Sequence, residues 1–249
     1  MCGKSGIAAN VGRVLIVFNL LSETLVKTEK FKNPNYLGDP LINIAIASRF
    51  LPSEIILLDI SSRFQRSPCG SAYLETLPIH CEVPLGVGGS LTTEKATRLL
   101  KRGFDKIIVG NKSQKETDIT VLAKRFGSQA VSFCIDYAKS ERKDHVLLND
   151  KELHLSEAIN YIFEVQKSGF GEFIFNDKVA DGTRIGLRPD CQLITAVKET
   201  GIPITWIGGV KDKNNVLENF RDHQLDAIGV GAAYSYLDGT KQLLPHWNF

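Results

Sequence analysis

The sequence of 249 residues is poor in sulfur and has no long apolar run. It has one methionine and five cysteines (Cys2, Cys69, Cys81, Cys134 and Cys191), with no C-x-x-C pair. An odd number of separated cysteines argues against a disulfide framework and suits the reducing cytoplasm. No stretch approaches the roughly 18 apolar residues of a membrane span, so we expect no membrane partner. The five histidines lack metal-ligand spacing such as H-x-x-x-H, and we expect neither a metal nor another cofactor.

The sequence also has no large excess of charge of one sign. It has 30 basic and 28 acidic residues, a net charge of +2. A nucleic-acid partner normally requires a strong basic excess, so we expect none. Residues 1–12 contain glycines and one lysine but no long apolar core, which favours a flexible N-terminal extension over a signal peptide. The remaining residues, 13–249, match the usual size of an eight-stranded α/β barrel.

Two stretches about half a chain apart repeat one pattern. Each has a short apolar run ending in a glycine pair, Gly88-Gly89 or Gly208-Gly209, then a helical pattern and a second apolar run ending in glycine. This order is a βαβ unit, and its duplication predicts a barrel made of two halves. Because glycine lets backbone N–H groups approach an anion closely, we predict two related phosphate sites at one end of the barrel.

Eight apolar runs alternate with helical patterns, with no linker-like stretch between them. We predict strands at about Val14–Asn19, Ile55–Ile60, Leu85–Val87, Lys106–Val109, Ala130–Asp136, Phe173–Asn176, Ile204–Ile207 and Ala227–Val230. We predict helices at about Leu41–Phe50, Thr92–Arg102, Thr117–Phe126, Leu155–Ser168, Pro189–Thr200 and Lys213–Asp222. Pro78 should shorten the helix after the second strand, and residues 147–155 indicate a small hairpin or loop. The alternation predicts a single (β/α)8 TIM barrel of the phosphate-binding type.

Four charged residues stand at the predicted strand starts: Arg13, Glu54, Lys106 and Glu172. One interpretation is that they are ordinary solvated charges. The other is that they point inward and form a neutral ring across the floor of the barrel, where buried charges of mixed sign must pair. Such a ring would plug an opening through the barrel.

Several blocks of the sequence resemble, in order, the HisF cyclase subunit of imidazole glycerol phosphate synthase. They include Leu58-Asp59-Ile60, Val87-Gly88-Gly89, Phe126-Gly127-Ser128-Gln129-Ala130-Val131 and Asp181-Gly182-Thr183. The resemblance covers about residues 13 to 236. It implies a (β/α)8 barrel that receives ammonia from a HisH-like glutaminase docked at the N-terminal ends of the strands. The barrel would use this ammonia at the opposite end, on a phosphorylated substrate.

The same resemblance assigns roles to individual residues. Arg13, Glu54, Lys106 and Glu172 match a family ring that gates ammonia, and Asp105 and Gln129 match residues that face the glutaminase. The substrate-binding positions are Gly88, Gly89, Ser90, Gly110 and Asn111 for one phosphate, and Asp181, Gly182, Thr183, Gly208, Gly209, Gly231 and Ala232 for the other. Ser90, Gly110-Asn111 and Gly231-Ala232 depart from the usual family residues. The second phosphate site is the better preserved.

The catalytic positions match less well. The family uses two aspartates as general acid and base, and Asp136 matches one of them. The other position is Asn19, and asparagine cannot hold or release a proton near neutral pH. Losing one proton-transfer group costs about 10²–10⁴ in rate. Lys27 matches a family lysine near the substrate.

Residues 25–40 resemble a side branch of the family, the HisF paralogs encoded with surface-polysaccharide genes. Those paralogs also lack the first aspartate, and standard cyclases usually have glycine where this chain has Thr28. We therefore predict ammonia delivery for amidination in surface-polysaccharide sugar synthesis. The alternatives are the standard cyclase reaction of histidine biosynthesis and a non-catalytic partner that activates the glutaminase. A related sugar-phosphate isomerase is a further hypothesis, but it leaves the four floor charges without a purpose.

Overall fold

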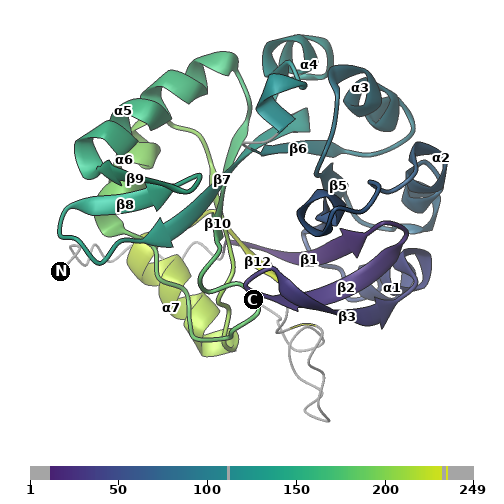
Figure 1. Ribbon diagram of the computed structural model, residues 1–249, viewed down its shortest axis with the longest axis horizontal. Coiled ribbons are helices and arrows are strands. Elements are labelled where there is room, and N and C mark those ends of the chain that lie inside the picture. Colours follow the sequence, from purple (N-terminus) through teal and green to yellow (C-terminus); the bar gives the residue numbers. More distant parts are fainter. Residues whose placement is uncertain (1–11, 111–112, 232–233, 235–249) are drawn as a thin grey trace.

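Eight parallel strands close into a barrel in the computed structural model, which describes residues 12–110, 113–231 and 234. They are β1 (Arg13–Leu21), β4 (Glu54–Asp59), β5 (Leu85–Gly88), β6 (Lys106–Gly110), β7 (Val131–Lys139), β10 (Glu172–Asp177), β11 (Ile204–Ile207) and β12 (Ala227–Val230). β12 pairs with β1 and β10 pairs with β7, which closes the ring (Figure 1). The predicted (β/α)8 barrel is therefore confirmed. The predicted N-terminal extension lies outside the described residues except for Gly12.

Helices surround the barrel (Figure 1). They are α1 (Pro40–Ser48), α2 (Ser71–Leu74), α3 (Thr93–Lys101), α4 (Ile119–Phe126), α5 (Leu155–Val165), α6 (Cys191–Glu199) and α7 (Lys213–His223). Short 3₁₀ turns are η1 (Ser61–Phe64), η2 (Leu77–His80), η3 (Ser113–Lys115), η4 (Ser128–Ala130) and η5 (Gln166–Ser168). Pro78 lies in η2, and the helix before it, α2, has only four residues, so the segment after β4 has a short helix as predicted. In the described parts of the chain, no helix is long and apolar enough to cross a membrane.

Side-chain caps decide where the helices begin. Thr92 caps α3, where its hydroxyl accepts a hydrogen bond from the backbone of Lys95. Asp118 and Asp190 cap α4 and α6 in the same way, so both helices begin two residues later than predicted. A carboxylate at the N-cap satisfies N–H groups of the first turn that have no partner within the helix.

Strand periodicity separates two apolar layers. In β1, Val14 and Ile16 belong to the large layer between strands and helices, whereas Leu15 and Val17 belong to a small cluster inside the barrel. The inner cluster also contains Ile56, Ile108, Cys134, Ile174, Ile207 and Ala227 from other strands. Because side chains alternate along a strand, Arg13 and Asn19 share the inward face of β1 with Leu15 and Val17. β1 thus places the Arg13 charge at the floor of the barrel, the N-terminal end of its strands, and the Asn19 amide at the mouth, the C-terminal end.

The two halves of the barrel repeat their hydrogen bonds as well as their sequence pattern. The carboxylate of Asp105 accepts from the backbone N of Leu85 at 2.8 Å, and the carboxylate of Asp226 accepts from that of Ile204 at the same distance. Asp59 and Asp177, which end β4 and β10, each bind the backbone N–H two residues on. The duplication therefore extends to side chains that fix the loops at both ends of the barrel.

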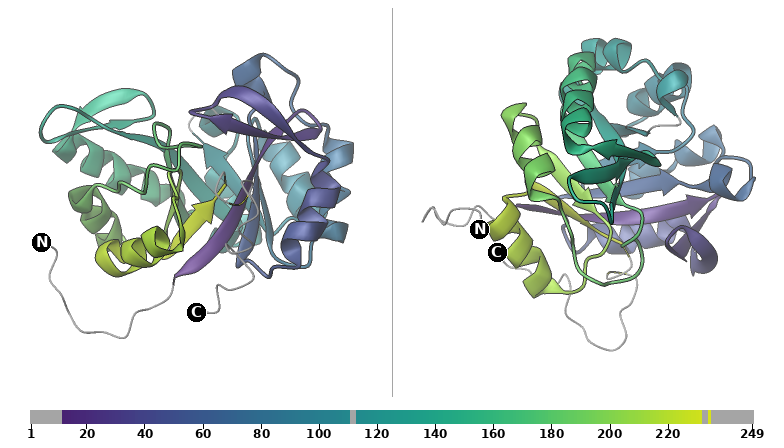
Figure 2. Two further views of the ribbon diagram at one scale, coloured as in Figure 1. Left: turned by 90° about the horizontal axis from the view of Figure 1, so that it is seen from below. Right: turned by 60° about the vertical axis from the view of Figure 1, so that its left-hand side comes forward.

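Each half also carries a β-hairpin after its first strand. One is β2 (Thr24–Glu29) with β3 (Lys32–Gly38), and the other is β8 (His145–Leu148) with β9 (Lys151–His154). Both lie at the same end of the barrel, the C-terminal end of its strands (Figure 2). The second hairpin was expected at residues 147–155, but the first was missed. Its turn uses Lys30 and Phe31 at positive φ, where glycine or asparagine would have signalled a hairpin.

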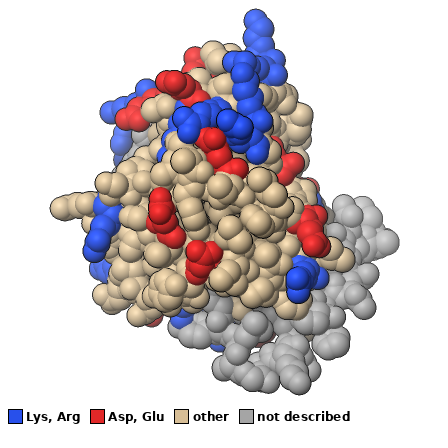
Figure 3. All heavy atoms as spheres, turned by 90° about the vertical axis from the view of Figure 1, so that its right-hand side faces the viewer, with Lys and Arg blue, Asp and Glu red and all other residues tan. Residues whose placement is uncertain are grey.

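One side of the barrel is largely uncharged. Figure 3 shows few charged side chains over much of the side formed by α1 and α2. α1 has no charged residue, and its Ile42 and Ile46 are exposed, as is Ile79 of η2. This helix is apolar on its outer face as well as toward the core, unlike the amphipathic α3 and α4.

Candidate functional site

The four charges at the strand starts point inward and contact one another. Lys106 Nζ lies 2.6 Å from Glu54 Oε2 and 2.9 Å from Glu172 Oε2. Arg13 lies 2.5 Å from Glu172 Oε1 and 3.6 Å from Glu54 Oε2. Glu54, Lys106 and Glu172 are buried, while the Arg13 side chain is 42% exposed. The ring therefore closes the floor, with Arg13 on its outer side.

The two carboxylates of this ring have different surroundings. Glu172 also accepts hydrogen bonds from Ser132 and Thr205, each at 2.7 Å. Burial raises the pKa of Glu172, but Lys106, Arg13 and Thr205 outweigh it, and the pKa falls to about 2. Glu54 shares Lys106 and is repelled by Glu172, so burial dominates and raises its pKa. Glu172 is thus the fixed anion of the floor, and Glu54 is the weaker partner.

Above the floor the barrel interior is apolar. The inner cluster around Val17, Ile108 and Ile207 fills the middle of the barrel. Glycines stand where larger side chains would collide with it: a Cβ at Gly229 would lie 2.8 Å from Val17 and 2.9 Å from Ile207. A neutral molecule can be accommodated in such a layer more easily than an ion, because an ion loses its hydration there.

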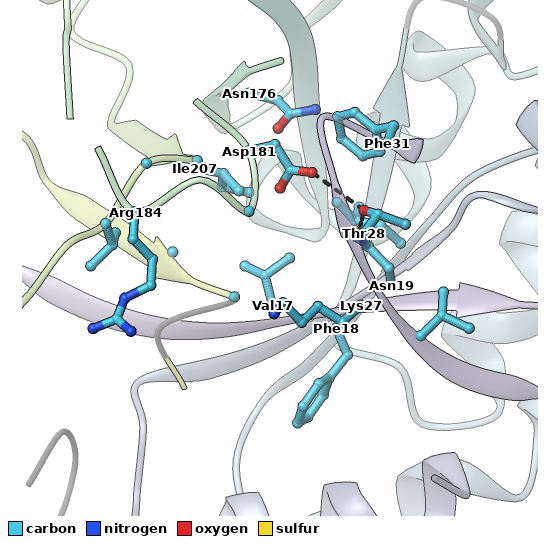
Figure 4. Close-up of a pocket in the computed structure, with 18 of the residues that line it drawn as sticks. Val17, Phe18, Asn19, Lys27, Thr28, Phe31, Asn176, Asp181, Arg184 and Ile207 are labelled. Carbon is cyan, nitrogen blue, oxygen red and sulfur yellow. Dashed lines mark hydrogen bonds between the residues drawn. The ribbon is translucent and has the colours of Figure 1, made fainter. Parts of the chain in front are cut away.

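A pocket opens at the mouth of the barrel (Figure 4). It lies between the β2–β3 hairpin, the loop after β10 and the glycines after β11 and β12. The described residues that line it carry six polar or charged side chains: Asn19, Lys27, Thr28, Asn176, Asp181 and Arg184. Asp181 is the carboxylate in this lining.

Asp136, which the resemblance predicts to be a catalytic aspartate, does not line this pocket in the described structure. Its carboxylate accepts from Asn176 Nδ2 at 3.1 Å and pairs with Arg63 at 3.1 Å and Lys178 at 3.6 Å. Asn176 therefore stands between Asp136 and the pocket. Sequence reasoning missed Arg63, whose guanidinium also lies 4.3 Å from the centre of the Phe31 ring.

Asn19 is connected to Asp181 through Thr28 (Figure 4). Asn19 Nδ2 donates to Thr28 Oγ1 at 3.2 Å, and Thr28 Oγ1 donates to Asp181 Oδ2 at 3.4 Å. Burial raises the pKa of Asp181 to about 6, against the backbone N–H of Phe31 and the Thr28 hydroxyl, which favour the carboxylate. Asn19 and Thr28, two of the positions at which the sequence departs from the standard cyclase pattern, are thus in direct contact.

Two further cations face the mouth from opposite walls. Lys27 extends from β2, and burial lowers its pKa, with Arg184 acting in the same direction and Glu29 opposing it. Arg184 follows β10 and donates to the backbone oxygen of Lys211 at 3.4 Å. Like Arg63 and Lys178, Arg184 had no sequence signal beyond its place in a loop. Together these cations make the mouth suitable for an anionic ligand.

At the first predicted phosphate site, some of the predicted anion-binding groups contact neighbouring residues of the protein instead. The Gly110 N–H donates to Ser113 Oγ at 3.1 Å, which leaves that N–H committed. Gly88 and Gly89 pack closely: a Cβ at Gly88 would lie 2.9 Å from Ile108, and one at Gly89 would lie 2.7 Å from Asp59. Neither these residues nor Ser90 lines the pocket. Asn111 lies outside the described residues.

The second predicted phosphate site borders the pocket. Gly182, Gly208, Gly209 and Gly231 all line it together with Asp181. Gly208 has a φ of +98° because its backbone turns against Asp177, where a Cβ would lie 2.7 Å from the carbonyl oxygen. The Thr183 hydroxyl instead donates to the Ala180 carbonyl within its own turn. Ala232 lies outside the described residues.

The two predicted interface residues lie at the floor end and are exposed. Asp105 holds the start of β5 through the Leu85 bond, and Asp226 does the same in the other half. Asp105 therefore has a structural role that requires no partner. Gln129 donates to the carbonyl of Phe126 at 3.2 Å.

Comparison with known proteins agrees with this geometry. The chain is 29% identical over 239 residues to a Vibrio vulnificus protein named provisionally as imidazole glycerol phosphate synthase subunit hisF3, covering 93% of this chain and 91% of that protein. It is 30% identical to a provisionally named HisF subunit of Leptospira interrogans (84% and 83% covered). It is 28% identical to the imidazole glycerol phosphate synthase subunit HisF of Leuconostoc mesenteroides (90% of each).

These relatives confirm the resemblance to HisF that the sequence blocks indicated. Residues 14–239 also match the family described as histidine biosynthesis protein. This match begins at Val14, next to Arg13, and continues past β12, the last strand of the barrel. The chain belongs to the histidine biosynthesis protein family.

Proposed function

We propose that this protein is a HisF-like synthase subunit that takes ammonia from a HisH-like glutaminase through the barrel and uses it for C–N bond formation. The acceptor is a phosphorylated or sugar substrate bound at the mouth. Within this reading we favour amidination in surface-polysaccharide sugar synthesis. The observation that carries the proposal is the closed ring of Arg13, Glu54, Lys106 and Glu172 beneath an apolar barrel interior.

The ring supports the proposal because buried charges at the floor bring no evident advantage to a barrel through which no molecule passes. Three buried charges carry a desolvation cost of several kcal/mol each, which pairing only partly offsets. Apolar side chains of similar size would give a floor at least as stable. A polar floor followed by an apolar interior suits passage of neutral ammonia, which can exchange hydrogen bonds with the ring and then leave it.

The mouth supports an anionic acceptor. Lys27 and Arg184 line the pocket together with the glycines of the second phosphate site, so one phosphate has both cations and backbone N–H groups within the same cavity. The pocket does not include Gly88, Gly89, Ser90 or Gly110 of the first predicted phosphate site. These contacts favour an acceptor whose phosphate lies at the second predicted site.

The direct test supplies the protein and its glutaminase with amide-¹⁵N glutamine and a pool of phosphorylated and sugar compounds from the host. Mass spectrometry should find ¹⁵N in one phosphorylated or sugar compound. Arg13→Ala should lower the yield of labelled product per glutamate released, while ammonium chloride restores product formation. Arg142→Ala, which removes an exposed arginine paired with Glu152, is the matched control. Unchanged yield in Arg13→Ala would refute passage through the floor.

Two further experiments separate the alternatives. Robust growth of a cyclase-deficient histidine auxotroph that carries this gene would favour the cyclase reaction of histidine biosynthesis over amidination. For the non-catalytic alternative, Asp136→Asn is informative. If it abolishes product but leaves glutaminase stimulation intact, the barrel is a catalyst; if ammonia incorporation is unchanged, the barrel only activates or relays.

A further inference from the structure

We infer that Asp181 has taken over the proton-transfer role of the carboxylate missing at Asn19, with the Thr28 hydroxyl as the relay between them. The inference rests on the proposed function, since it concerns how the same mouth carries out its chemistry. It assigns a catalytic role to a side chain on the loop after β10, opposite the strand that carries Asn19 (Figure 4).

The geometry joins three residues in one line. Asn19 has no proton to exchange, but its amide donates to Thr28 Oγ1 and so leaves the hydroxyl proton to point at Asp181. Thr28 is 3% exposed, so few waters compete for this hydroxyl. Gly182 lies against the Thr28 carbonyl, and Lys30 N donates to the Asp181 carbonyl at 2.9 Å. The hairpin and the loop are thereby held together at this point.

Asp136 leaves this role open. Its carboxylate contacts Asn176, Arg63 and Lys178. Asp181, in contrast, lines the pocket with Asn19 and Lys27. One carboxylate near the mouth is thus paired with two cations outside the pocket, and the other is buried beside a hydroxyl at its edge, so the two have different surroundings.

The surroundings of Asp181 favour a proton that moves near neutral pH. Burial raises its pKa to about 6, and Asp177 at the end of β10 acts in the same direction. Arg63 from η1, the Phe31 N–H and the Thr28 hydroxyl from the hairpin oppose this. A general acid or base works best when its pKa lies close to the working pH.

The step balances as follows. As ammonia attacks the acceptor carbonyl carbon, the C–N bond forms and the C=O π pair moves to the oxygen, which leaves an oxyanion and a protonated nitrogen. One nitrogen proton passes to Thr28 Oγ1 while the Thr28 proton passes to Asp181 Oδ2, and the reverse transfer converts the oxyanion to a hydroxyl. A second nitrogen proton then reaches this hydroxyl by the same route as the C–O bond breaks and the C=N bond forms, so water leaves and Asp181 returns to the carboxylate.

The test uses the full chain with ammonium chloride as nitrogen source and the imidazole glycerol phosphate synthase substrate as probe. Asp181→Asn should lower turnover about 10²–10⁴-fold, and Thr28→Val about tenfold. In the Asn19→Asp background, Asp181→Asn should cost less than tenfold, because the ordinary carboxylate has been restored. Thr28→Ser, which keeps the hydroxyl, should retain activity. Equal losses from Asp181→Asn in both backgrounds would overturn the inference.

A second measurement does not depend on turnover. Carboxyl ¹³C NMR, assigned with Asp181→Asn, should show Asp181 titrating near pH 6, and Thr28→Val should move that titration upward. Titration of Asp181 below pH 4.5, or no response to Thr28→Val, would overturn the inference. If no variant turns over the probe, the cyclase alternative fails, while the NMR titration still decides the role of Asp181.

Discussion

The floor and the mouth of this barrel are built on the same strands but use charge in opposite ways. At the floor, two cations and two anions from four strands contact one another and leave little charge over. At the mouth, Lys27 and Arg184 face a pocket whose described lining holds one carboxylate, Asp181. The fully paired charges of the floor suit a fixed barrier, whereas the excess of positive charge at the mouth suits binding of an anionic ligand.

The largest effect should come from removing the central floor cation. Lys106→Met leaves the buried Glu54 and Glu172 with only the partly exposed Arg13 as a shared cation, so we expect a loss of about 3–5 kcal/mol in the free energy of unfolding. Lys178→Met makes the same change at the mouth, where Lys178 pairs with the exposed Asp150 and with Asp136, which keeps Arg63 as a partner, and should cost at most about 1 kcal/mol. Urea denaturation of both variants makes the comparison; similar losses would mean that the floor is not specially dependent on pairing.

The next effect concerns backbone contact at the mouth. Gly182 and Gly201 have nearly the same φ, +71° and +70°, but a Cβ at Gly182 would collide with the Thr28 carbonyl, whereas nothing lies within 4 Å of one at Gly201. Gly201→Ala should therefore cost about 1 kcal/mol for the strained φ alone. Gly182→Ala should cost more, about 2–3 kcal/mol, and should increase hydrogen exchange in β2. If thermal unfolding shows the same loss of stability in both variants, the β2–β3 hairpin can move away from residue 182 at little cost, which would contradict this prediction.

The smallest effects should be opposite pH dependences at the two ends. The folded-state pKa of Glu172, about 2, lies below its ordinary 4.5; its contribution to stability is present above about pH 4.5 and is lost as the pH falls toward 2. The folded-state pKa of Asp181, about 6, lies above its ordinary 3.8; its contribution is present below about pH 4 and is lost as the pH rises through 6.

Asp181→Asn should accordingly stabilise the protein at pH 7.5 by about 1–2 kcal/mol, with little effect at pH 4. Denaturant midpoints measured at both pH values, with Asp150→Asn as the exposed control, test this. A destabilised Asp181→Asn protein at pH 7.5 would contradict the burial argument.

Buried strands could be predicted closely from the sequence. β11 and β12 match their predicted bounds, because a short apolar run between helical patterns has few other solutions. The β2–β3 hairpin could not be predicted from the sequence, because Lys30-Phe31 is not a recognised turn pair and β3 is exposed over most of its length. An exposed strand at the edge of a barrel carries no apolar alternation to detect.

The sequence predicted which residues belong to the candidate site better than it predicted the contacts between them. The apolar run Val14–Asn19 placed Arg13 and Asn19 at the two ends of the first strand, but nothing in the sequence indicated that Asn176 would separate Asp136 from the pocket. Arg63 comes from a loop with no repeated pattern, and its reach across the mouth to Asp136 depends on the closed barrel. Contacts between residues 73 positions apart along the chain are a property of topology rather than of local sequence.

The pairing of β1 with β12 has a consequence for synthesis of the chain on the ribosome. β1 is made before the other seven barrel strands, but its partner on one side, Ala227–Val230, is made after them. Until then β1 presents an open edge, and Arg13 lacks Glu172, which follows 159 residues later. Barrel closure is therefore a late step with high contact order, and the nascent barrel depends on protection of that edge until β12 is made.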